Sequence, residues 1–263
     1  MHDPTPAGLD RPTLRSRLFS RPRTVLLAGI AVIAVTAGAT LVGGQGQTED
    51  QTPLFSDGFP MARPMAASDA QAVTFSVVGD SITADHAYPE QVSRRIVGER
   101  SWAVFAQEPG TSFVGGWALG GATTADMLAG YSPVSSDVLV VIAGTNDIRA
   151  GVPFERIGEN LLAIVSRSDS DRVLVSSVPP RDEFRARTVE YNAWLHDFVL
   201  EQGWGWIDGS RGLRDSTHPE VYAAGLSYDG THPTAEGGQI LGSAVQAALS
   251  TQPTAQDTAV DLP

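Results

Sequence analysis

Short apolar runs alternate with amphipathic stretches through the middle of the chain. Five apolar runs have the length of strands: Val73–Val78, Trp102–Ala106, Asp137–Ala143, Arg172–Val178 and Trp204–Ile207. Helical patterns fall between and after them, over Tyr88–Val97, Thr124–Ala129, Phe154–Ser166, Asp182–Gln202 and Ala235–Leu249. Continuous apolar strands separated by helices predict an α/β domain whose mostly parallel sheet is covered on both faces. Because ligands bind beyond the carboxyl ends of such strands, we expect the chemistry there.

A stretch of nineteen residues without a charge, residues 24–42, precedes this pattern. A helix needs ~20 such residues to cross a bilayer, and five arginines lie on its N-terminal side. The positive-inside tendency then leaves residues 1–23 in the cytoplasm and exports the chain after residue 42. We expect a single-pass anchor in the cell membrane of a bacterium, with an extracytoplasmic domain. The alternative is a cleaved signal peptide with Ala37-Gly38-Ala39 as its cleavage site, which would give a secreted protein.

The remaining segments differ in composition and charge. Residues 43–70 are rich in Gly, Gln, Pro and Ser and predict a flexible linker. The domain is expected over residues 71–250, and residues 251–263 are expected to be a disordered tail. Cysteine is absent, so neither disulfides nor thiol chemistry is available. From residue 43 onward, thirteen arginines face 28 acidic residues, a net charge of −15 that would repel nucleic acid.

The first predicted strand runs into Gly79-Asp80-Ser81. A serine hydroxyl becomes a useful nucleophile only when a neighbouring base takes its proton. Glycine at position 79 allows a sharp turn from strand to helix, which would present the Ser81 side chain at the edge of the sheet. The alternative is that Ser81 simply caps the following helix.

Two copies of Asp-x-x-His-Pro could supply that base. Asp229 and His232 lie three residues apart and run directly into the C-terminal helix, whereas Asp215 and His218 lie in a loop with arginines. In the first copy, Asp229 can orient the imidazole while its other nitrogen faces Ser81. We therefore expect His232 to be the base and His218 to be a surface residue.

Oxyanion donors are expected at two further turns. Asn146 follows the clearest buried strand, in Gly144-Thr145-Asn146-Asp147, and its amide could donate to a tetrahedral intermediate. The Gly120-Gly121 pair precedes a helix start, and a glycine N–H there could be a second donor. The alternative for both sites is an ordinary turn.

Metal chemistry has little support in the sequence. The five histidines show no paired ligand spacing, and there is no cysteine. Asp85 and His86 could bind a metal only with distant help. We therefore expect no metal and no cofactor.

The four blocks GDS, GGATT, GTND and DGTHP together resemble those of SGNH hydrolases, the GDSL esterase/lipase superfamily, over roughly residues 73–249. The resemblance implies a flavodoxin-like three-layer α/β/α sandwich. It also implies that Ser81 is the nucleophile, His232 the general base and Asp229 the partner of the imidazole. The backbone N–H groups of Ser81 and Gly121 and the side chain of Asn146 would form the oxyanion hole.

Residues 101–121 depart from this family's pattern, because they are rich in glycine and aromatics where many members have a simple strand ending in Asn-x-Gly. That region lines the substrate pocket in the family, so the substrate class does not transfer. The expected function is an exported serine esterase acting on a small-molecule, glycan or lipid ester. The alternatives are an O-acetyl deacetylase or acyltransferase on cell-envelope glycans, and a non-catalytic binding domain that keeps the fold.

Overall fold

A computed structural model of the chain describes residues 72–251. Its strands are β1 (Val73–Gly79), β2 (Thr111–Ala118), β3 (Val138–Ile142), β4 (Arg172–Ser176) and β5 (Gly205–Ile207). Its α-helices are α1 (Ser81–Ala84), α2 (Pro89–Val92), α3 (Trp102–Ala106), α4 (Thr124–Gly130), α5 (Thr145–Ala150), α6 (Phe154–Val165), α7 (Arg185–Glu201) and α8 (Ala235–Ser250). Two 3₁₀ turns, η1 (Asp182–Phe184) and η2 (Arg211–Leu213), complete the described elements.

The five strands form one sheet in the order β2-β1-β3-β4-β5, and every neighbouring pair is parallel. This is the strand order of flavodoxin-like doubly wound folds. The predicted parallel sheet is therefore confirmed, with four of the five expected strands in place. All carboxyl ends of the strands lie at one edge, and the order reverses between β1 and β3.

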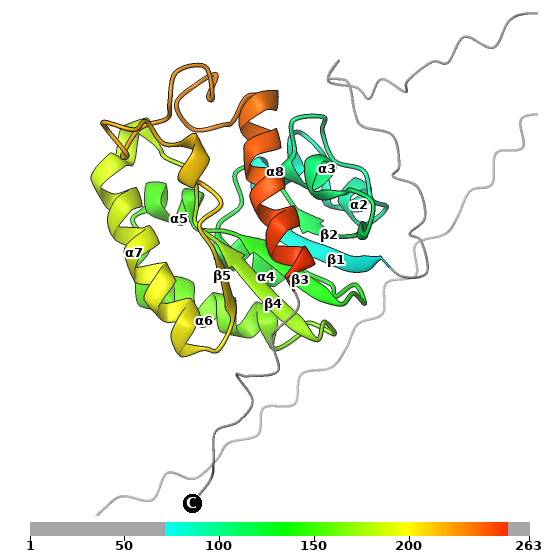
Figure 1. Cartoon of the computed structure of the whole chain (residues 1–263). Coiled ribbons are helices and arrows are strands. Elements are labelled where there is room, and N and C mark those ends of the chain that lie inside the picture. The colour runs from blue at the N-terminus through cyan, green and yellow to red at the C-terminus, as the bar shows by residue number, and fades with distance from the viewer. Residues whose placement is uncertain (1–71, 252–263) are drawn as a thin grey trace, which may run out of the picture. The chain divides into compact units, whose positions relative to one another are not determined.

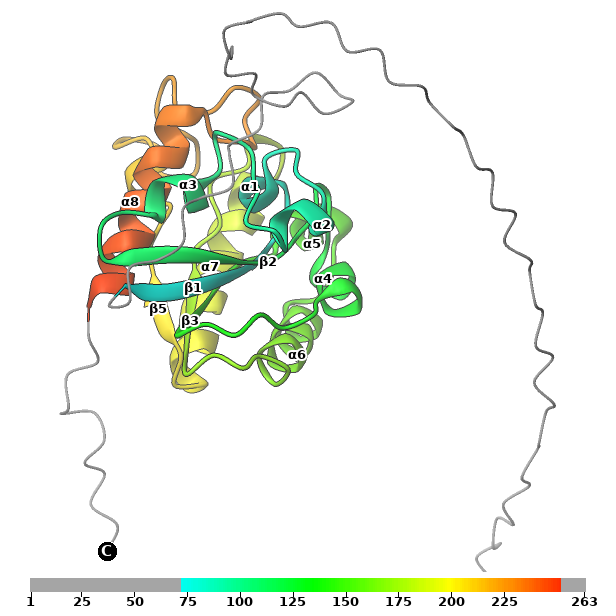
Figure 2. The ribbon, with the colours of Figure 1, turned by 90° about the vertical axis from the view of Figure 1, so that its right-hand side faces the viewer.

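Helices cover both faces of the sheet, as Figures 1 and 2 show. On one face α8 packs against α3 and lies over β1 and β2. On the other face α4 packs against α6, and α7 packs against α5 and α6. The helices expected over Thr124–Ala129, Phe154–Ser166, Asp182–Gln202 and Ala235–Leu249 correspond to α4, α6, η1 with α7, and α8. The result is the expected α/β/α layering.

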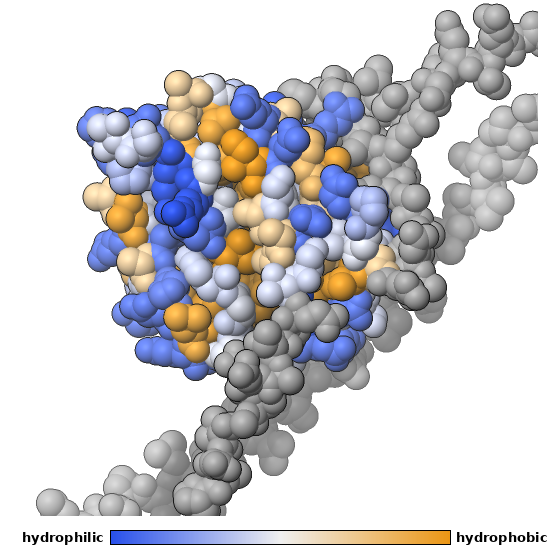
Figure 3. All heavy atoms as spheres, viewed as in Figure 1, coloured by the Kyte–Doolittle hydropathy of each residue, from blue (hydrophilic) through white to orange (hydrophobic). Residues whose placement is uncertain are grey.

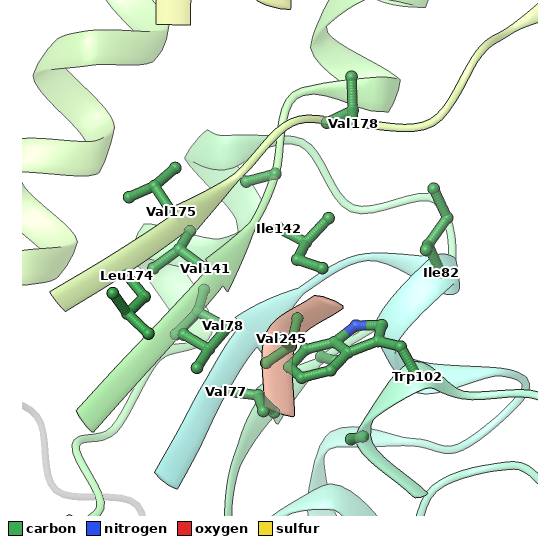
Figure 4. Close-up of a cluster of buried hydrophobic side chains, with 14 of the residues drawn as sticks. Val77, Val78, Ile82, Trp102, Val141, Ile142, Leu174, Val175, Val178 and Val245 are labelled. Atoms are coloured by element: carbon green, nitrogen blue, oxygen red, sulfur yellow. The ribbon is translucent and has the colours of Figure 1, made fainter. Parts of the chain in front are cut away.

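The core lies on both faces of the central strands (Figure 4). Val77 and Val78 alternate on β1 and are fully buried, so both faces of this strand are covered by side chains. Trp102 is also fully buried, and its Nε1 donates to Thr83 Oγ1 at 3.0 Å. That hydrogen bond joins α3 to α1, the short helix that begins with Ser81.

The strand predicted over Trp102–Ala106 is wrong, because this segment is helix α3 and the second strand is β2. Ser101 caps α3 and its Oγ accepts the N–H of Ala103 at 3.3 Å. A five-residue apolar run fits a buried helix turn as well as a strand. β2 escaped prediction because Gly115 and Gly116 interrupt its apolar pattern.

The helix predicted over Tyr88–Val97 is too long, since only α2 is helical. Arg95 has a φ of 66°, in the left-handed region, which ends any helix there. Gly98 then packs so closely on Asp85 that a side chain at position 98 would clash with it.

The expected membrane anchor, linker and tail fall almost wholly outside the described residues. Within residues 72–251, no helix is both long enough and apolar enough to span a membrane. The segment over residues 24–42 stays a prediction.

Candidate active site

Ser81 lies where β1 ends and α1 begins, at the carboxyl edge of the sheet. The cap of α1 is Asp80, whose Oδ1 accepts the N–H of Ile82 at 2.9 Å. A side chain at Gly79 would clash with Thr83, so the tight turn into α1 requires glycine at this position. Because Asp80 performs the capping, the Ser81 hydroxyl is available for another partner. The alternative in which Ser81 is the cap is not what the structure contains.

The partner of Ser81 is His232. Ser81 Oγ and His232 Nε2 are 2.9 Å apart, and His232 Nδ1 is 2.7 Å from Asp229 Oδ2. Asp229 Oδ1 also accepts the backbone N–H groups of Thr231 at 2.9 Å and His232 at 2.7 Å. Partial burial opposes ionisation of Asp229, but these hydrogen bonds outweigh it and lower the pKa of the carboxyl. Asp229 is therefore a charged group that fixes both the loop and the imidazole.

The second Asp-x-x-His-Pro copy forms the same turn without the same ring contact. Asp215 Oδ1 accepts the N–H groups of Thr217 and His218, each at 2.9 Å. The His218 ring, however, has Glu220 as its nearest carboxylate at 3.8 Å, and its side chain is 68% exposed. The structure thus brings His232, and not His218, to Ser81.

An aromatic ring supports the imidazole from the side. The rings of Tyr228 and His232 are stacked, with centroids 5.7 Å apart and planes 12° apart. The Arg100 guanidinium lies over Tyr228, 4.8 Å from the ring centroid, and pairs with Asp85 at 2.9 Å. Asp85 ends α1, the helix that begins with Ser81. This series of contacts connects the serine's helix to the histidine's loop.

The expected oxyanion donors lie around the same serine. Asn146 is in the first turn of α5 and only 6% exposed, and its Nδ2 donates one hydrogen to Ala122 O at 3.0 Å. Gly121, directly before Ala122, has a φ of 79° in the turn after β2. A Cβ placed on Gly120 would lie 4.0 Å from Ser81 Cβ, so this turn passes beside the serine. Ser81, Asn146 and the glycine pair are therefore neighbours in space.

Asp147 connects the two segments that carry the expected oxyanion donors. Its carboxylate accepts the Thr124 N–H at 3.0 Å and the Thr124 hydroxyl at 2.6 Å. Asn160 in turn donates to Thr124 Oγ1 at 3.0 Å. Burial raises the pKa of Asp147, and the Thr124 hydrogen bonds oppose this shift. Sequence reasoning did not identify this brace, although both residues lie inside the recognised blocks.

A second buried acid, Asp80, lies directly beside Ser81 in the chain. Asp80 is fully buried, and its Oδ2 has no hydrogen-bond partner within the described part of the chain. Burial raises the pKa of Asp80 to about 6, although the Ile82 N–H opposes the shift. The buried hydroxyl of Thr145, at the start of α5, lies near this carboxyl and also opposes the shift, although the two groups do not form a well-aligned hydrogen bond.

Among residues 72–251, no group of three metal-ligating side chains is close enough together to hold a metal ion. The Asp85 carboxylate, a conceivable metal ligand from the sequence, instead accepts hydrogen bonds from Arg100 at 2.8 and 3.1 Å. Trp117, one of the aromatic residues within 101–121, is only 8% exposed and packs against Gly130.

Two hollows lie near the segment that links β5 to α8. One, of about 590 Å³, is lined in part by Ser227 and Gly230 and so adjoins the loop of Asp229 and His232. The other, of about 310 Å³, lies between α7 and the residues after β5, with Trp206 in its wall, and contains no member of the Ser81–His232–Asp229 set. Figure 3 shows hydrophilic residues gathered over this segment, at the upper left.

Comparison with known proteins gives one family. Residues 77–240 match the model of the GDSL-like Lipase/Acylhydrolase family. A member of the lipolytic protein G-D-S-L family from Veillonella parvula DSM 2008 has a similar structure, with a TM-score of 0.51 at 17% identity over 69% of this chain and 100% of that one. Axe2, an acetylxylan esterase from Geobacillus stearothermophilus, gives a TM-score of 0.52 at 17% identity over 68% of this chain and 95% of that one. At identities as low as 17%, these similarities show a shared fold and nothing more.

No match was found among curated proteins. The family match, however, covers more than half of the chain and includes all four recognised blocks. The chain therefore belongs to the GDSL-like lipase/acylhydrolase family, the SGNH hydrolases.

Proposed function

We propose that the chain is a serine esterase that hydrolyses carboxylic esters through an acyl-enzyme on Ser81. The observation that carries the proposal is the continuous set of hydrogen bonds from Ser81 through His232 to Asp229, with distances of 2.9 and 2.7 Å. Its geometry is that of a nucleophile, a base within reach of its proton, and a carboxylate that orients the base.

In the proposed reaction, His232 Nε2 takes the hydroxyl proton as Ser81 Oγ attacks the ester carbonyl carbon. The tetrahedral intermediate collapses, and the imidazolium returns the proton to the departing alcohol. Water then attacks the acyl-enzyme with His232 again as the base, which releases the acid and restores Ser81. Asp229 stays ionised throughout and stabilises the imidazolium. No step requires a cofactor.

The negative oxygen of each intermediate needs donors in fixed positions. The backbone N–H groups of Ser81 and Gly121 and the Asn146 side chain are proposed for this role. The hydrogen bond from Asn146 to Ala122 fixes the amide and leaves its second Nδ2 hydrogen for the substrate. The Asp147–Thr124 brace keeps the turn of Gly121 and the helix of Asn146 in register.

A second candidate function is the removal or transfer of acetyl groups on cell-envelope glycans. The observation that favours it is the shared fold with an acetylxylan esterase. The acyl-enzyme would be the same, and a sugar hydroxyl would replace water as the acceptor in the transferase version. A panel of p-nitrophenyl acyl esters and acetylated glycans, with released acetate measured, separates these substrate classes.

We also propose that the enzyme works outside the cytoplasm, tethered by residues 24–42. This part of the proposal is supported by the uncharged stretch and the arginines before it. Protease added to spheroplasts should release a catalytic fragment beginning within residues 43–70. A mature soluble protein beginning near Thr40 would show instead that the segment is a cleaved signal peptide.

The mechanism is tested by paired histidine variants of the purified chain. His232→Ala should reduce kcat on a short-chain p-nitrophenyl ester as much as Ser81→Ala does, because the members of one catalytic triad act as a unit. His218→Ala is the matched control and should keep the wild-type rate, because it removes the corresponding ring from the other Asp-x-x-His-Pro copy. Activity retained in folded Ser81→Ala, or the reverse order of the two histidines, would contradict the mechanism.

A further inference from the structure

Arg181 is a buried cation whose hydrogen-bonding groups are unused. It lies in the segment between β4 and η1, directly before η1, and its side chain is only 9% exposed. Its Nε is enclosed without an acceptor, and within residues 72–251 the guanidinium forms no hydrogen bond. The nearest carboxylate, Glu183, is 3.8 Å away and 73% exposed, while the ring of Phe184 lies 5.5 Å from Cζ. A guanidinium has five N–H donors, so this one has capacity for an acceptor.

A buried guanidinium without an acceptor lowers the stability of the fold, and a bound ligand that supplies an acceptor would remove this cost. Burying a charge without a hydrogen-bonded partner destabilises a fold by several kcal/mol in typical cases. Other arginines that are partly buried have close partners, as Arg100 has in Asp85 at 2.9 Å and Arg214 has in Asp208. Burial lowers the pKa of Arg181 and the charge of Arg149 lowers it further, whereas the charges of Glu183, Asp80 and Asp229 oppose this shift. The chain has acidic residues in excess, yet none of those described is placed against this guanidinium at hydrogen-bonding distance.

The position of Arg181 is beside the catalytic loop. The N–H of Asp182, the next residue, donates to the carbonyl of Gly230 at 2.9 Å, and Gly230 lies between Asp229 and His232. Arg149, which is close enough to lower the pKa of Arg181, is on α5, three residues after Asn146. Within the described residues Arg149 is exposed and has no ion pair. Two cations without a hydrogen-bonded acid thus lie near the elements that carry the base and the proposed oxyanion donor.

We infer that Arg181, assisted by Arg149, binds a carboxylate carried by the ester substrate close to the bond that is cleaved. This inference rests on the proposed esterase function and narrows its substrate class to anionic esters. A planar guanidinium with free N–H groups matches a carboxylate through two parallel hydrogen bonds. An uncharged alkyl or aryl group would leave the guanidinium without an acceptor.

Two pairs of matched esters test the inference on the purified full chain. On the acyl side the pair is p-nitrophenyl hydrogen succinate and its methyl ester. On the alcohol side the pair is 4-acetoxybenzoate and its methyl ester. Wild type should prefer the charged member of at least one pair by about tenfold or more in kcat/KM, mainly through KM. In Arg181→Gln that preference should fall by about tenfold or more, to near parity between the two esters, as expected when a charged hydrogen bond is lost.

Three controls separate recognition from structure. Arg181→Lys keeps the charge and should recover part of the preference, while Arg149→Gln should reduce it less than Arg181→Gln does. Arg156→Gln removes an exposed arginine on α6 that pairs with Glu159, and it should leave the preference unchanged. Equal losses on the charged and neutral members would mean that Arg181 only supports the fold, and would overturn the inference.

A binding measurement distinguishes this inference from the proposed reaction. Succinate should bind wild type more tightly than Arg181→Gln by calorimetry, whether or not any ester is hydrolysed. If wild type hydrolyses neither member of any pair, the esterase proposal fails, and the succinate result alone decides on the carboxylate site. Hydrolysis with no charge preference, together with equal succinate binding by both proteins, would overturn the inference and leave the esterase function standing.

Discussion

Replacing Asp80 with asparagine should stabilise the protein near neutral pH and have little effect in acid. Asp80 is fully buried, with Oδ1 bonded to the Ile82 N–H at 2.9 Å and Oδ2 without a partner among the described residues. Asparagine keeps the Oδ1 acceptor that caps α1. Its new N–H₂ group can donate to the nearby Thr145 hydroxyl, whose contact with the wild-type carboxylate is too poorly aligned to be a full hydrogen bond. The substitution therefore removes a buried charge without removing the cap.

The magnitude follows from the pKa of Asp80. Burial raises this pKa from 3.8 to about 6, so the folded state holds the proton more tightly than the unfolded state. The stabilisation from the protonated acid is fully present below pH 3.8 and is lost as the pH rises through about 6. At about 1.4 kcal/mol per unit, the wild type loses about 3 kcal/mol across this range, and asparagine loses none. The variant should therefore gain about 3 kcal/mol over wild type near pH 7.5, or about 6–12 °C in Tm.

Urea unfolding followed by circular dichroism, at about pH 7.5 and about pH 4, measures both parts of this expectation. The advantage of Asp80→Asn should shrink below about 1 kcal/mol at the acidic pH. Asp215→Asn is the matched control, because Asp215 holds a similar turn through Oδ1 but has a lowered pKa, owing to the His218 and Thr217 amides. It should show no gain near neutral pH. A difference between Asp80→Asn and wild type that does not change with pH would refute the reasoning.

Three other changes test the site through catalysis. Asp229→Asn should lose most of the activity, because an amide at this position favours the wrong imidazole tautomer, and kcat on a p-nitrophenyl ester measures this. Asn146→Ala should reduce kcat by about 10²–10³, the usual effect of losing one oxyanion donor; an unchanged kcat would remove Asn146 from that role. Tyr228→Ala should lower kcat by about 2–10-fold, since ring stacking contributes about 0.5–1.5 kcal/mol. Tyr228→Phe should restore the rate, and a failure of phenylalanine to do so would argue against stacking as the cause.

The sheet could be predicted from the sequence because its inner strands are continuous apolar runs. Val138–Ile142 is buried on both faces, so every position in it is apolar and no helical period competes. β2 was missed for the opposite reason. Its residues include Gly115 and Gly116, which fit against neighbouring segments by close backbone approach, and for Gly116 that neighbour is β1. This requirement becomes visible only once the adjoining strand is placed.

In the candidate site, too, local features could be predicted and contacts between distant segments could not. Ser81, His232 and Asp229 were identified because each lies in a short block with its own local geometry. The contacts that join one block to another have no pattern in the sequence that would predict them. The Asp147–Thr124 brace joins residues 23 positions apart, and the contact of Tyr228 with Arg100 joins separate loops. Arg181 follows two prolines in a segment with no periodicity, so nothing in the sequence distinguishes it from a solvated surface arginine.

Buried polar side-chain atoms without a hydrogen-bond partner show where the fold is less stable than it could be. Within residues 72–251, buried side-chain atoms without a partner occur on Asp80, Tyr131, Thr145, Arg181 and Arg187. Three of these residues lie at the carboxyl edge beside the proposed nucleophile, its base or the start of α5. Buried polar groups are almost always paired in folded proteins, so clustered exceptions mark positions where packing and stability are not the main constraint. In the proposed complex, a substrate carboxylate supplies the hydrogen-bond acceptors that Arg181 lacks in the free protein. A neutral ester cannot do so, and this difference is what would make Arg181 select anionic esters.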